Sequence, residues 1–277
     1  MNNVSKRIKQ RLITTVDDAP KKMTFRELER EVLRTCDASR NTVKSAIKKL
    51  VEEGELTYTN LFGRTFIEKA FHRPIRLSSR IVVAPPGIAF FPEPKDIVVR
   101  IQSGATFGNG QHPSTRLAIN GIEHVTENTR FLDQHHSTAM LDVGTGSGIL
   151  AIAGIKLGID CAIGIDRDPC AEYESNLNAR YNALNDRLSH RFCFEKRSLD
   201  MTQGEFQMVA ANLRYPTLIR ICGKLASMMA SKSVIVLSGF KPEETAHIHQ
   251  TYARQGLTRV WQSAERGWES IVYAKSD

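Results

Sequence analysis

The sequence predicts an α/β fold: a mainly parallel sheet covered by helices, with an antiparallel hairpin at its end and a small basic domain before it. Two observations predict the sheet. Short apolar segments alternate with helical stretches after residue 95, and no helix fits between the last two strands. A third observation, the charge distribution, predicts the separate domain. Residues 1–80 hold 18 Lys+Arg against 10 Asp+Glu, whereas residues 81–277 hold 20 against 20, so the whole net charge of +8 lies in the first part.

Three helices followed by a hairpin are expected in residues 1–72. Apolar residues recur at helical spacing in the first segment, and Thr24 with Glu27 three residues later forms a capping box that begins the second helix. Gly54 ends the third helix, and alternating residues on both sides of a turn at 60–63 predict the hairpin. The expected elements are helices over residues 4–15, from Thr24 to about 35 and over 40–53, and strands over 56–59 and 64–67.

This order of elements resembles a winged helix-turn-helix, in which the third helix can enter the major groove of DNA. One face of that helix is basic, and Arg40, Lys44, Lys48 and Lys49 are the candidates for nucleic-acid contact. The alternative is a solvated charged face on a module that docks a protein or forms a homodimer. We favour docking or dimerisation, because four positive residues over 40–53 stand against two negative ones and the first helix and the hairpin carry further scattered charge.

A proline-rich stretch separates the basic domain from the sheet. Residues 84–94 hold four of the ten prolines, which remove backbone donors and disfavour regular structure. We therefore expect a winged-helix-like domain over 1–72, a linker with lead-in strands over 73–105 and the main domain over 106–277. The strands expected after residue 95 are 97–101, 139–143, 161–166, 191–194, 207–211, 234–237, 257–262 and 269–274, and the helices are 148–157, 170–183, 217–229 and 243–255.

A glycine-rich turn follows the strand over 139–143. Its glycines alternate as G-x-G-x-G at Gly144, Gly146 and Gly148, where they permit a sharp turn and a close approach of a ligand to the backbone. Asp166 ends the next strand, 22 residues after Gly144, at the point where a carboxylate can accept both ribose hydroxyls of an adenosine. Asp166 can alternatively cap the helix that begins at Pro169. We favour ribose binding, because the whole strand, turn, helix and carboxylate unit is present.

Four linked motifs carry a family resemblance. The pattern DVGTGSG followed by GIDRDP resembles class I S-adenosylmethionine-dependent methyltransferases, whose fold also has an antiparallel final hairpin. The further motifs FGNGQHPST (107–115), ANL (211–213) and SGF (238–240), with Trp268, resemble the ribosomal large-subunit protein eleven (L-eleven) lysine methyltransferase family, which reads FGTGTHPTT, ANI and SGI. The resemblance covers roughly residues 80–277. Residues 1–72 differ from the small amino-terminal module of that family.

The resemblance implies S-adenosylmethionine as the cofactor and assigns residues to it. The expected cofactor-binding residues are Phe107, Thr115, Asp142, Gly144, Gly146, Gly148, Asp166 and Asn212. Asn212 is also the candidate for orienting the methyl acceptor. His112 is a second catalytic candidate, although we favour a histidine that only holds its loop by a side-chain hydrogen bond. Trp268 is expected in the hairpin core, with the acceptor pocket as the alternative.

The function expected from these features is methylation of a protein amine, either a lysine or an N-terminus. The substrate expected is a protein, and the ribosomal protein of the family is one candidate. Two alternatives stay open: a small-molecule methyltransferase with a dimerising winged helix, and a DNA-binding regulator that senses the cofactor. No transmembrane segment or secretory signal is apparent, and five cysteines, an odd number without a C-x-x-C pair, fit the reducing cytoplasm. His135 and His136 have no partners at metal-ligand spacing, so no metal site is expected.

Overall fold

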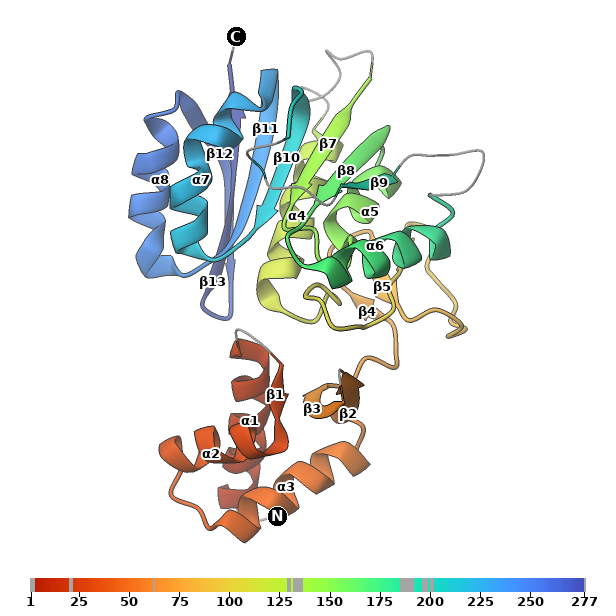
Figure 1. Cartoon of the computed structure of the whole chain (residues 1–277), viewed down its shortest axis with the longest axis vertical. Coiled ribbons are helices and arrows are strands. Elements are labelled where there is room, and N and C mark those ends of the chain that lie inside the picture. Colours follow the sequence, from red (N-terminus) through yellow and green to blue (C-terminus); the bar gives the residue numbers. More distant parts are fainter. Residues whose placement is uncertain are drawn as a thin grey trace. The chain divides into compact units, whose positions relative to one another are not determined.

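The structure is a computed structural model, and it describes residues 3–19, 22–61, 63–128, 131, 137–184, 192–195, 199 and 202–276. The chain divides into two compact units, Met1–Phe71 and His72–Asp277 (Figure 1). In the described residues no helix is both long enough and apolar enough to cross a membrane.

The N-terminal unit contains the three helices and the hairpin that the sequence predicts, with one short strand added. Its elements are α1 (Asn3–Asp18), β1 (Met23–Thr24), α2 (Phe25–Thr35), α3 (Arg40–Glu52), β2 (Leu56–Leu61) and β3 (Arg64–Lys69). The three strands form an antiparallel sheet in the order β1-β3-β2. The added strand β1 is only two residues long, too short for an alternating pattern to mark it in the sequence.

Local hydrogen bonds explain where the helices of this unit begin. The capping box expected at α2 is present: the Thr24 hydroxyl accepts from the backbone N–H of Glu27, and the Glu27 carboxylate accepts from the backbone N–H of Thr24. Ser39 caps α3 in the same way by accepting from Thr42 N–H at 3.2 Å. The apolar faces of the helices then meet the hairpin in one core, whose buried members are Ile8, Leu12, Leu28, Val32, Val43, Ala46, Ile47, Leu50, Leu56 and Ile67.

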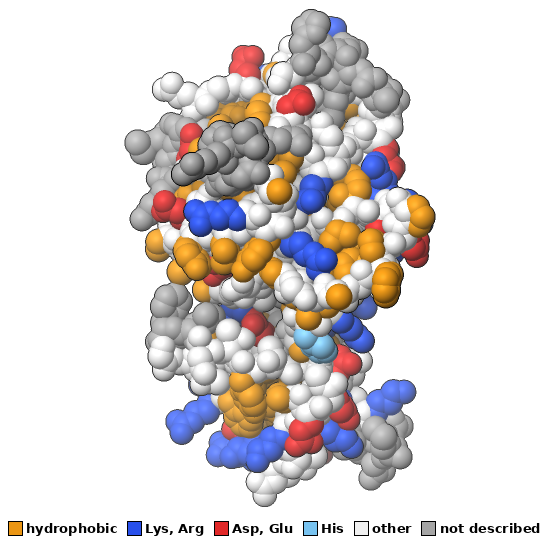
Figure 2. Space-filling model, turned by 90° about the vertical axis from the view of Figure 1, so that its right-hand side faces the viewer, with side chains coloured by type: hydrophobic (Ala, Val, Ile, Leu, Met, Phe, Trp, Pro, Cys, Tyr) orange, Lys and Arg blue, Asp and Glu red, His pale blue; other side chains and the backbone are white. Residues whose placement is uncertain are grey.

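The surface charge of this unit is mixed on the face that Figure 2 presents. Lysine and arginine side chains lie there beside acidic ones, around a group of hydrophobic side chains. Two ion pairs join distant segments of the unit, Lys9 with Glu53 at 2.6 Å and Lys69 with Asp17 at 3.1 Å. Such pairs neutralise part of the excess positive charge of this unit.

The second unit confirms the predicted α/β fold. In the described residues its main sheet has seven strands in the order β12-β13-β11-β10-β7-β8-β9. Strands β11, β10, β7, β8 and β9 run parallel to one another, and β13 pairs antiparallel with both β11 and β12. Its elements are β4 (Ile75–Arg76), β5 (Ile81–Ala84), β6 (Ile97–Arg100), α4 (Pro113–Glu127), β7 (Ala139–Val143), α5 (Ile149–Lys156), β8 (Cys161–Ile165), α6 (Pro169–Tyr181), β9 (Phe192–Glu195), β10 (Phe206–Asn212), α7 (Tyr215–Ser227), β11 (Met229–Phe240), η3 (Pro242–Glu244), α8 (Thr245–Ala253), β12 (Leu257–Glu265) and β13 (Trp268–Lys275).

Successive residues of the central strands face opposite helical layers. Along β11, Ile235 and Leu237 pack in the core cluster that contains residues of α7 and α8, whereas Val236 faces Gly121 of α4. In Figure 1, α7 and α8 lie in front of the sheet and α4 lies behind it. Because both faces are covered, the parallel strands are mainly apolar, and polar residues such as Asp142 and Asn212 stand near their carboxyl ends.

Three features of this unit differ from the sequence-based expectation. The strand expected over 97–101 is present as β6, but it pairs with β5 in a separate three-stranded sheet, β4-β5-β6, instead of joining the main sheet. Helix α4 was not among the expected helices; Pro113 lies in its first turn, where proline is favoured. Strand β11 begins at Met229 and not at Val234, and a register shift against β10 accommodates the extra residues.

Candidate functional site

The glycine-rich turn lies between β7 and α5, at the carboxyl end of the central strand. Gly144 and Gly146 have φ angles of +75° and +53°, a region that residues with a side chain rarely adopt. A Cβ atom at Gly146 would lie 2.5 Å from the carbonyl oxygen of Phe107. The turn therefore requires glycine at position 146, both for its dihedral angle and for the close approach of the FGNGQHPST segment.

Asp166 lies directly against this turn. Its Oδ2 accepts a hydrogen bond from Gly146 N at 2.9 Å, and its Oδ1 accepts from Asp168 N at 2.9 Å. The residue is half-buried, and an ionised carboxylate has about four acceptor positions, so two remain for a ligand. Asp168, and not Asp166, caps α6 by accepting from Cys170 N. The carboxylate at the end of β8 is thus free of the capping role that was its alternative.

Asp142, the penultimate residue of β7, holds the turn by hydrogen bonds. Its Oδ2 accepts from the Thr145 hydroxyl at 2.7 Å and from Ala151 N at 3.3 Å, while its buried Oδ1 has no hydrogen-bond partner among the described residues. Complete burial raises the pKa of Asp142 to about 7, the two hydrogen bonds act against that rise, and the charge of Asp166 adds to it. Asp142 therefore carries a carboxyl group that titrates near neutral pH inside the core of the site.

Three segments that are distant in sequence meet beside the turn. Asn212, at the end of β10, donates from Nδ2 to the hydroxyl of Thr115 in the first turn of α4, at 3.4 Å. Ser238 of β11 donates to the carbonyl of Ser114 at 2.9 Å. A Cβ atom at Gly239 would lie 2.9 Å from Asn212 Oδ1, so glycine is needed to leave room for that amide. The FGNGQHPST, ANL and SGF motifs consequently form one wall of the site.

His112, Phe107 and Trp268 form an aromatic group next to this wall. The His112 ring lies edge-on to Trp268 with centroids 4.7 Å apart, and to Phe107 at 5.2 Å. His112 Nδ1 accepts from Ser114 N at 3.2 Å and so caps α4. The ammonium of Lys241 lies 3.8 Å from the centre of the Trp268 ring, which is a cation–π contact. The buried Nε1 of Trp268 has no hydrogen-bond partner in the described part of the chain.

Two residues at the site were missed by sequence reasoning. Lys241 directly follows the SGF motif, and only this position in the sequence could have marked it as a site residue. Glu174 of α6 accepts from the backbone N–H groups of Ala105 and Thr106 and holds the segment that leads into FGNGQHPST. Nothing in the sequence pattern around Glu174 marks that role, because its partners are backbone groups 68 or more residues away.

Metal-ligating groups do not gather in this site. Among the described residues no three His, Cys, Asp or Glu side chains lie close enough together to hold a metal ion. His135 and His136, for which no metal role was expected, lie outside the described residues. No cysteine among the described residues forms a disulfide, and burial raises the pKa of Cys222 to about 11, which keeps its thiol protonated and unreactive.

Comparison with known proteins agrees with the motifs. Residues 34–276 match a family described as ribosomal protein L11 methyltransferase (PrmA). A ribosomal protein L11 methyltransferase of Geobacter sulfurreducens is 36% identical over 200 residues, which cover 72% of this chain and 62% of that protein. The Geobacter metallireducens protein of the same description is 32% identical over 202 residues, with the same coverage. This chain thus spans about 62% of the length of these two relatives.

Among solved structures, the ribosomal protein L11 methylase of Lactobacillus delbrueckii subsp. bulgaricus superimposes with a TM-score of 0.64 and 26% sequence identity. The superposition covers 74% of this chain and the whole of that one. The similarity confirms that the second unit has the class I methyltransferase fold expected from the DVGTGSG and GIDRDP motifs.

Proposed function

The chain belongs to the family of ribosomal protein L11 methyltransferases, and from this premise we propose that it transfers a methyl group from S-adenosylmethionine to an amine of a protein. The observation that carries the proposal is the convergence of Gly146, Asp166 and Asn212 at the carboxyl ends of β7, β8 and β10. Open α/β sheets bind ligands at this edge. Four motifs far apart in the sequence supply this one edge with the donors and acceptors that such a cofactor needs.

The residues present fit S-adenosylmethionine. The carboxylate of Asp166 has two acceptor positions left, which suits the two ribose hydroxyls of an adenosine. The turn at Gly144 and Gly146 has no side chains, so backbone and ligand can approach closely. Because Thr115 accepts from Asn212, its own hydroxyl hydrogen is left to donate to the methionine carboxylate. Phe107, half-exposed beside the turn, supplies apolar surface next to these polar groups.

When bound, S-adenosylmethionine supplies an electrophilic methyl group with a neutral thioether as the leaving group. The protein then has to position the acceptor nitrogen in line and exclude water. Asn212 Oδ1, which faces the space kept open by Gly239, can accept a hydrogen bond from the acceptor amine and orient its lone pair. A lysine has a reference pKa of about 10.4, and transfer into an apolar pocket lowers that value, so the amine loses its proton without a dedicated base.

In this mechanism His112 would have a structural role. Its Nδ1 is already engaged with Ser114 N–H at the start of α4, and its ring packs between Phe107 and Trp268. The aromatic group borders the proposed acceptor path. In this position Trp268 and His112 would exclude water from the acceptor amine, which is the second requirement of the transfer.

The acceptor we propose is a ribosomal protein, since the relatives are described as methyltransferases of ribosomal protein L11. Such a substrate would place the reaction in the cytoplasm. The small-molecule methyltransferase and the cofactor-sensing regulator are not favoured, because the family descriptions name a protein substrate. The N-terminal unit, which we propose to be a winged-helix module, would dock the substrate. Nucleic-acid contact through Arg40, Lys44, Lys48 and Lys49, and homodimerisation, are the other roles open to it.

The proposed function is tested with the full chain and S-adenosylmethionine labelled in the methyl group. Label is expected in purified ribosomal protein L11, at lysine or the N-terminal amine as located by mass spectrometry. An Asn212→Ala variant is expected to lose most of the transfer rate, because Asn212 is proposed both to orient the acceptor amine and to contribute to the cofactor site. Incubation with a whole-cell lysate serves as the second arm. Label found only in the low-mass fraction of that lysate would contradict a protein acceptor.

A further inference from the structure

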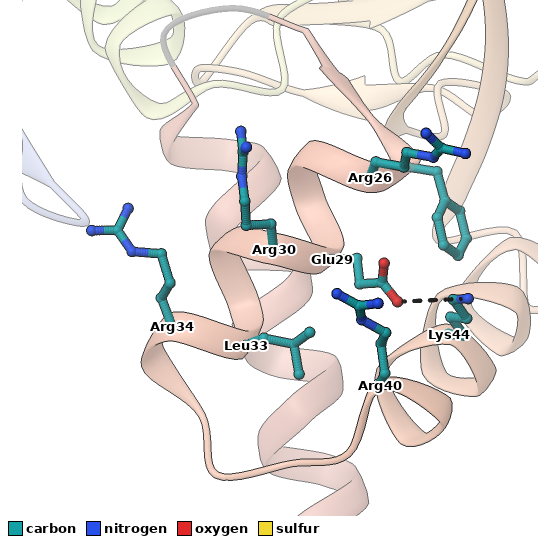
Figure 3. A pocket seen from close by; sticks show the side chains of 8 residues that line it. Arg26, Glu29, Arg30, Leu33, Arg34, Arg40 and Lys44 are labelled. Carbon is teal, nitrogen blue, oxygen red and sulfur yellow. Dashed lines mark ion pairs between the residues drawn. The ribbon is translucent and has the colours of Figure 1, made fainter.

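A groove in the N-terminal unit lies between α2 and α3. It has a volume of about 710 Å³ (Figure 3). Its lining residues are Phe25, Arg26, Glu29, Arg30, Leu33 and Arg34 of α2 with Arg40 and Lys44 of α3. Figure 3 shows Glu29 and Arg40 pointing toward each other from the two helices, with Lys44 on the far side of Glu29. The sequence pattern places Phe25 and Leu33 on the apolar face of the second helix, but it does not mark Arg26, Glu29, Arg30 and Arg34, because the groove forms only when α3 packs beside α2.

The groove concentrates the positive charge of its unit. Residues 1–71 hold 15 Lys+Arg against 10 Asp+Glu, and the groove alone holds five of these cations against one carboxylate. The guanidinium groups of Arg26, Arg30 and Arg40 form no ion pair with any residue that the structure describes, and that of Arg34 pairs only with exposed Glu31 at 3.3 Å. Such an exposed pair contributes little, so four guanidinium groups are available to a partner.

The spacing of the arginines on α2 matches that of acidic residues placed at every fourth position of a partner helix. Arg26, Arg30 and Arg34 recur every four residues, which places their successive Cα atoms about 6 Å apart along the helix axis. Glutamates at every fourth position of another helix have the same spacing. Arginine is also the cation that pairs with carboxylates in a two-point geometry. Phe25 and Leu33, which are only partly buried, add apolar surface to the groove.

The carboxylate of Glu29 favours a polypeptide over a nucleic acid as the ligand of this groove. Only 8% of this groove-lining residue is exposed. Its buried Oε1 has no hydrogen-bond partner among the residues that the structure describes, and Lys44 Nζ lies 3.9 Å away. A buried carboxylate oxygen without a hydrogen-bond donor is costly, and a ligand that supplies the donor removes the cost. Every nucleotide carries a negative phosphate, which Glu29 would repel. A polypeptide can instead place an ammonium, hydroxyl or amide group opposite it.

We propose that this groove binds an acidic helical segment of a partner protein. Carboxylates on that helix pair with Arg26, Arg30 and Arg34, and one hydrogen-bond donor in its central turn binds Glu29. The proposal goes beyond the methylation activity, since it does not depend on which acceptor the second unit modifies. It specifies the chemistry of the segment: glutamate or aspartate at every fourth position, an apolar residue beside them and one lysine among them.

Fluorescence anisotropy with the full chain tests this proposal. Two fluorescein-labelled helical peptides carry glutamate at every fourth position and leucine beside it, and they differ in one central residue, lysine or glutamate. We expect the lysine peptide to bind about tenfold more tightly although it is less acidic, because one hydrogen bond to a charged group is worth about 1.5–3 kcal/mol. The Glu29→Gln variant is expected to lose this preference while it still binds both peptides.

A charge-matched pair of variants separates the groove from general attraction. Arg30→Glu with Arg34→Glu should weaken binding of the lysine peptide at least tenfold, whereas Lys6→Glu with Arg7→Glu, the same charge change on exposed residues of α1, should alter it by less than about twofold. Thermal unfolding checks that all variants fold. Equal weakening by both pairs, no binding of either peptide, or tighter binding of a 20-base-pair DNA duplex that needs the same arginines would overturn the proposal.

Discussion

Replacing Asp166 with alanine should separate cofactor binding from folding. The carboxylate accepts from Gly146 N and Asp168 N, both at 2.9 Å, and two acceptor positions remain for the ribose. Hydrogen bonds to a charged group are worth about 1.5–3 kcal/mol each, and about 1.4 kcal/mol is a factor of ten in affinity. Losing even one ribose bond should therefore weaken S-adenosylmethionine binding at least tenfold. The turn also loses the acceptor for Gly146 N–H, which adds to the effect. Calorimetric titration measures it.

The matched control is Asp168→Ala, two residues along the same segment. Asp168 is exposed and caps α6 through Cys170 N–H, so its loss should lower the free energy of unfolding by about 1 kcal/mol. Its effect on cofactor affinity should stay within about twofold, which corresponds to about 0.4 kcal/mol. Equal affinities of the two variants, or a preference of the native chain for a nicotinamide dinucleotide, would refute the role assigned to Asp166.

Three further outcomes are expected. Gly146→Ala should weaken cofactor binding at least tenfold in equilibrium dialysis, because its Cβ would meet the Phe107 carbonyl at 2.5 Å and the left-handed backbone costs about 1–2 kcal/mol; unchanged affinity would contradict the crowding. Asp142 has a folded-state pKa of about 7, above its ordinary 3.8, so its stability contribution falls as pH rises from 4 to 7 and stays low above that. In urea unfolding, Asp142→Asn should gain up to about 4 kcal/mol relative to the native chain between pH 4 and pH 8, and parallel pH profiles would exclude a buried titrating carboxyl. Limited proteolysis should cut the linker between 72 and 95, within the mostly exposed residues 87–95. The two fragments should co-elute, because β5 pairs with β6. Cleavage only elsewhere would argue against an accessible linker.

Local patterns in the sequence predict most of the helices and strands. Apolar spacing and the Thr24–Glu27 capping box mark α2 because both depend on residues within one or two turns. The carboxylate 22 residues beyond Gly144 is equally predictable, since parallel strands joined by one helix bring their carboxyl ends to the same edge. The hydrogen bond between Asp166 and Gly146 N–H is the direct consequence of that connection.

Other features depend on contacts between distant segments, for which residue spacing carries no signal. Strand β6 has an ordinary apolar pattern, and only its partner β5 decides that it lies in a separate sheet. Lys241 covers the Trp268 ring because β11 and β13 are neighbours, although the two residues are far apart in the chain. Glu29 looks like one more surface charge on α2. It is buried among four arginines and a lysine because α3 packs beside α2. Contacts between distant residues of the core establish that packing, and the local sequence of α2 does not determine it.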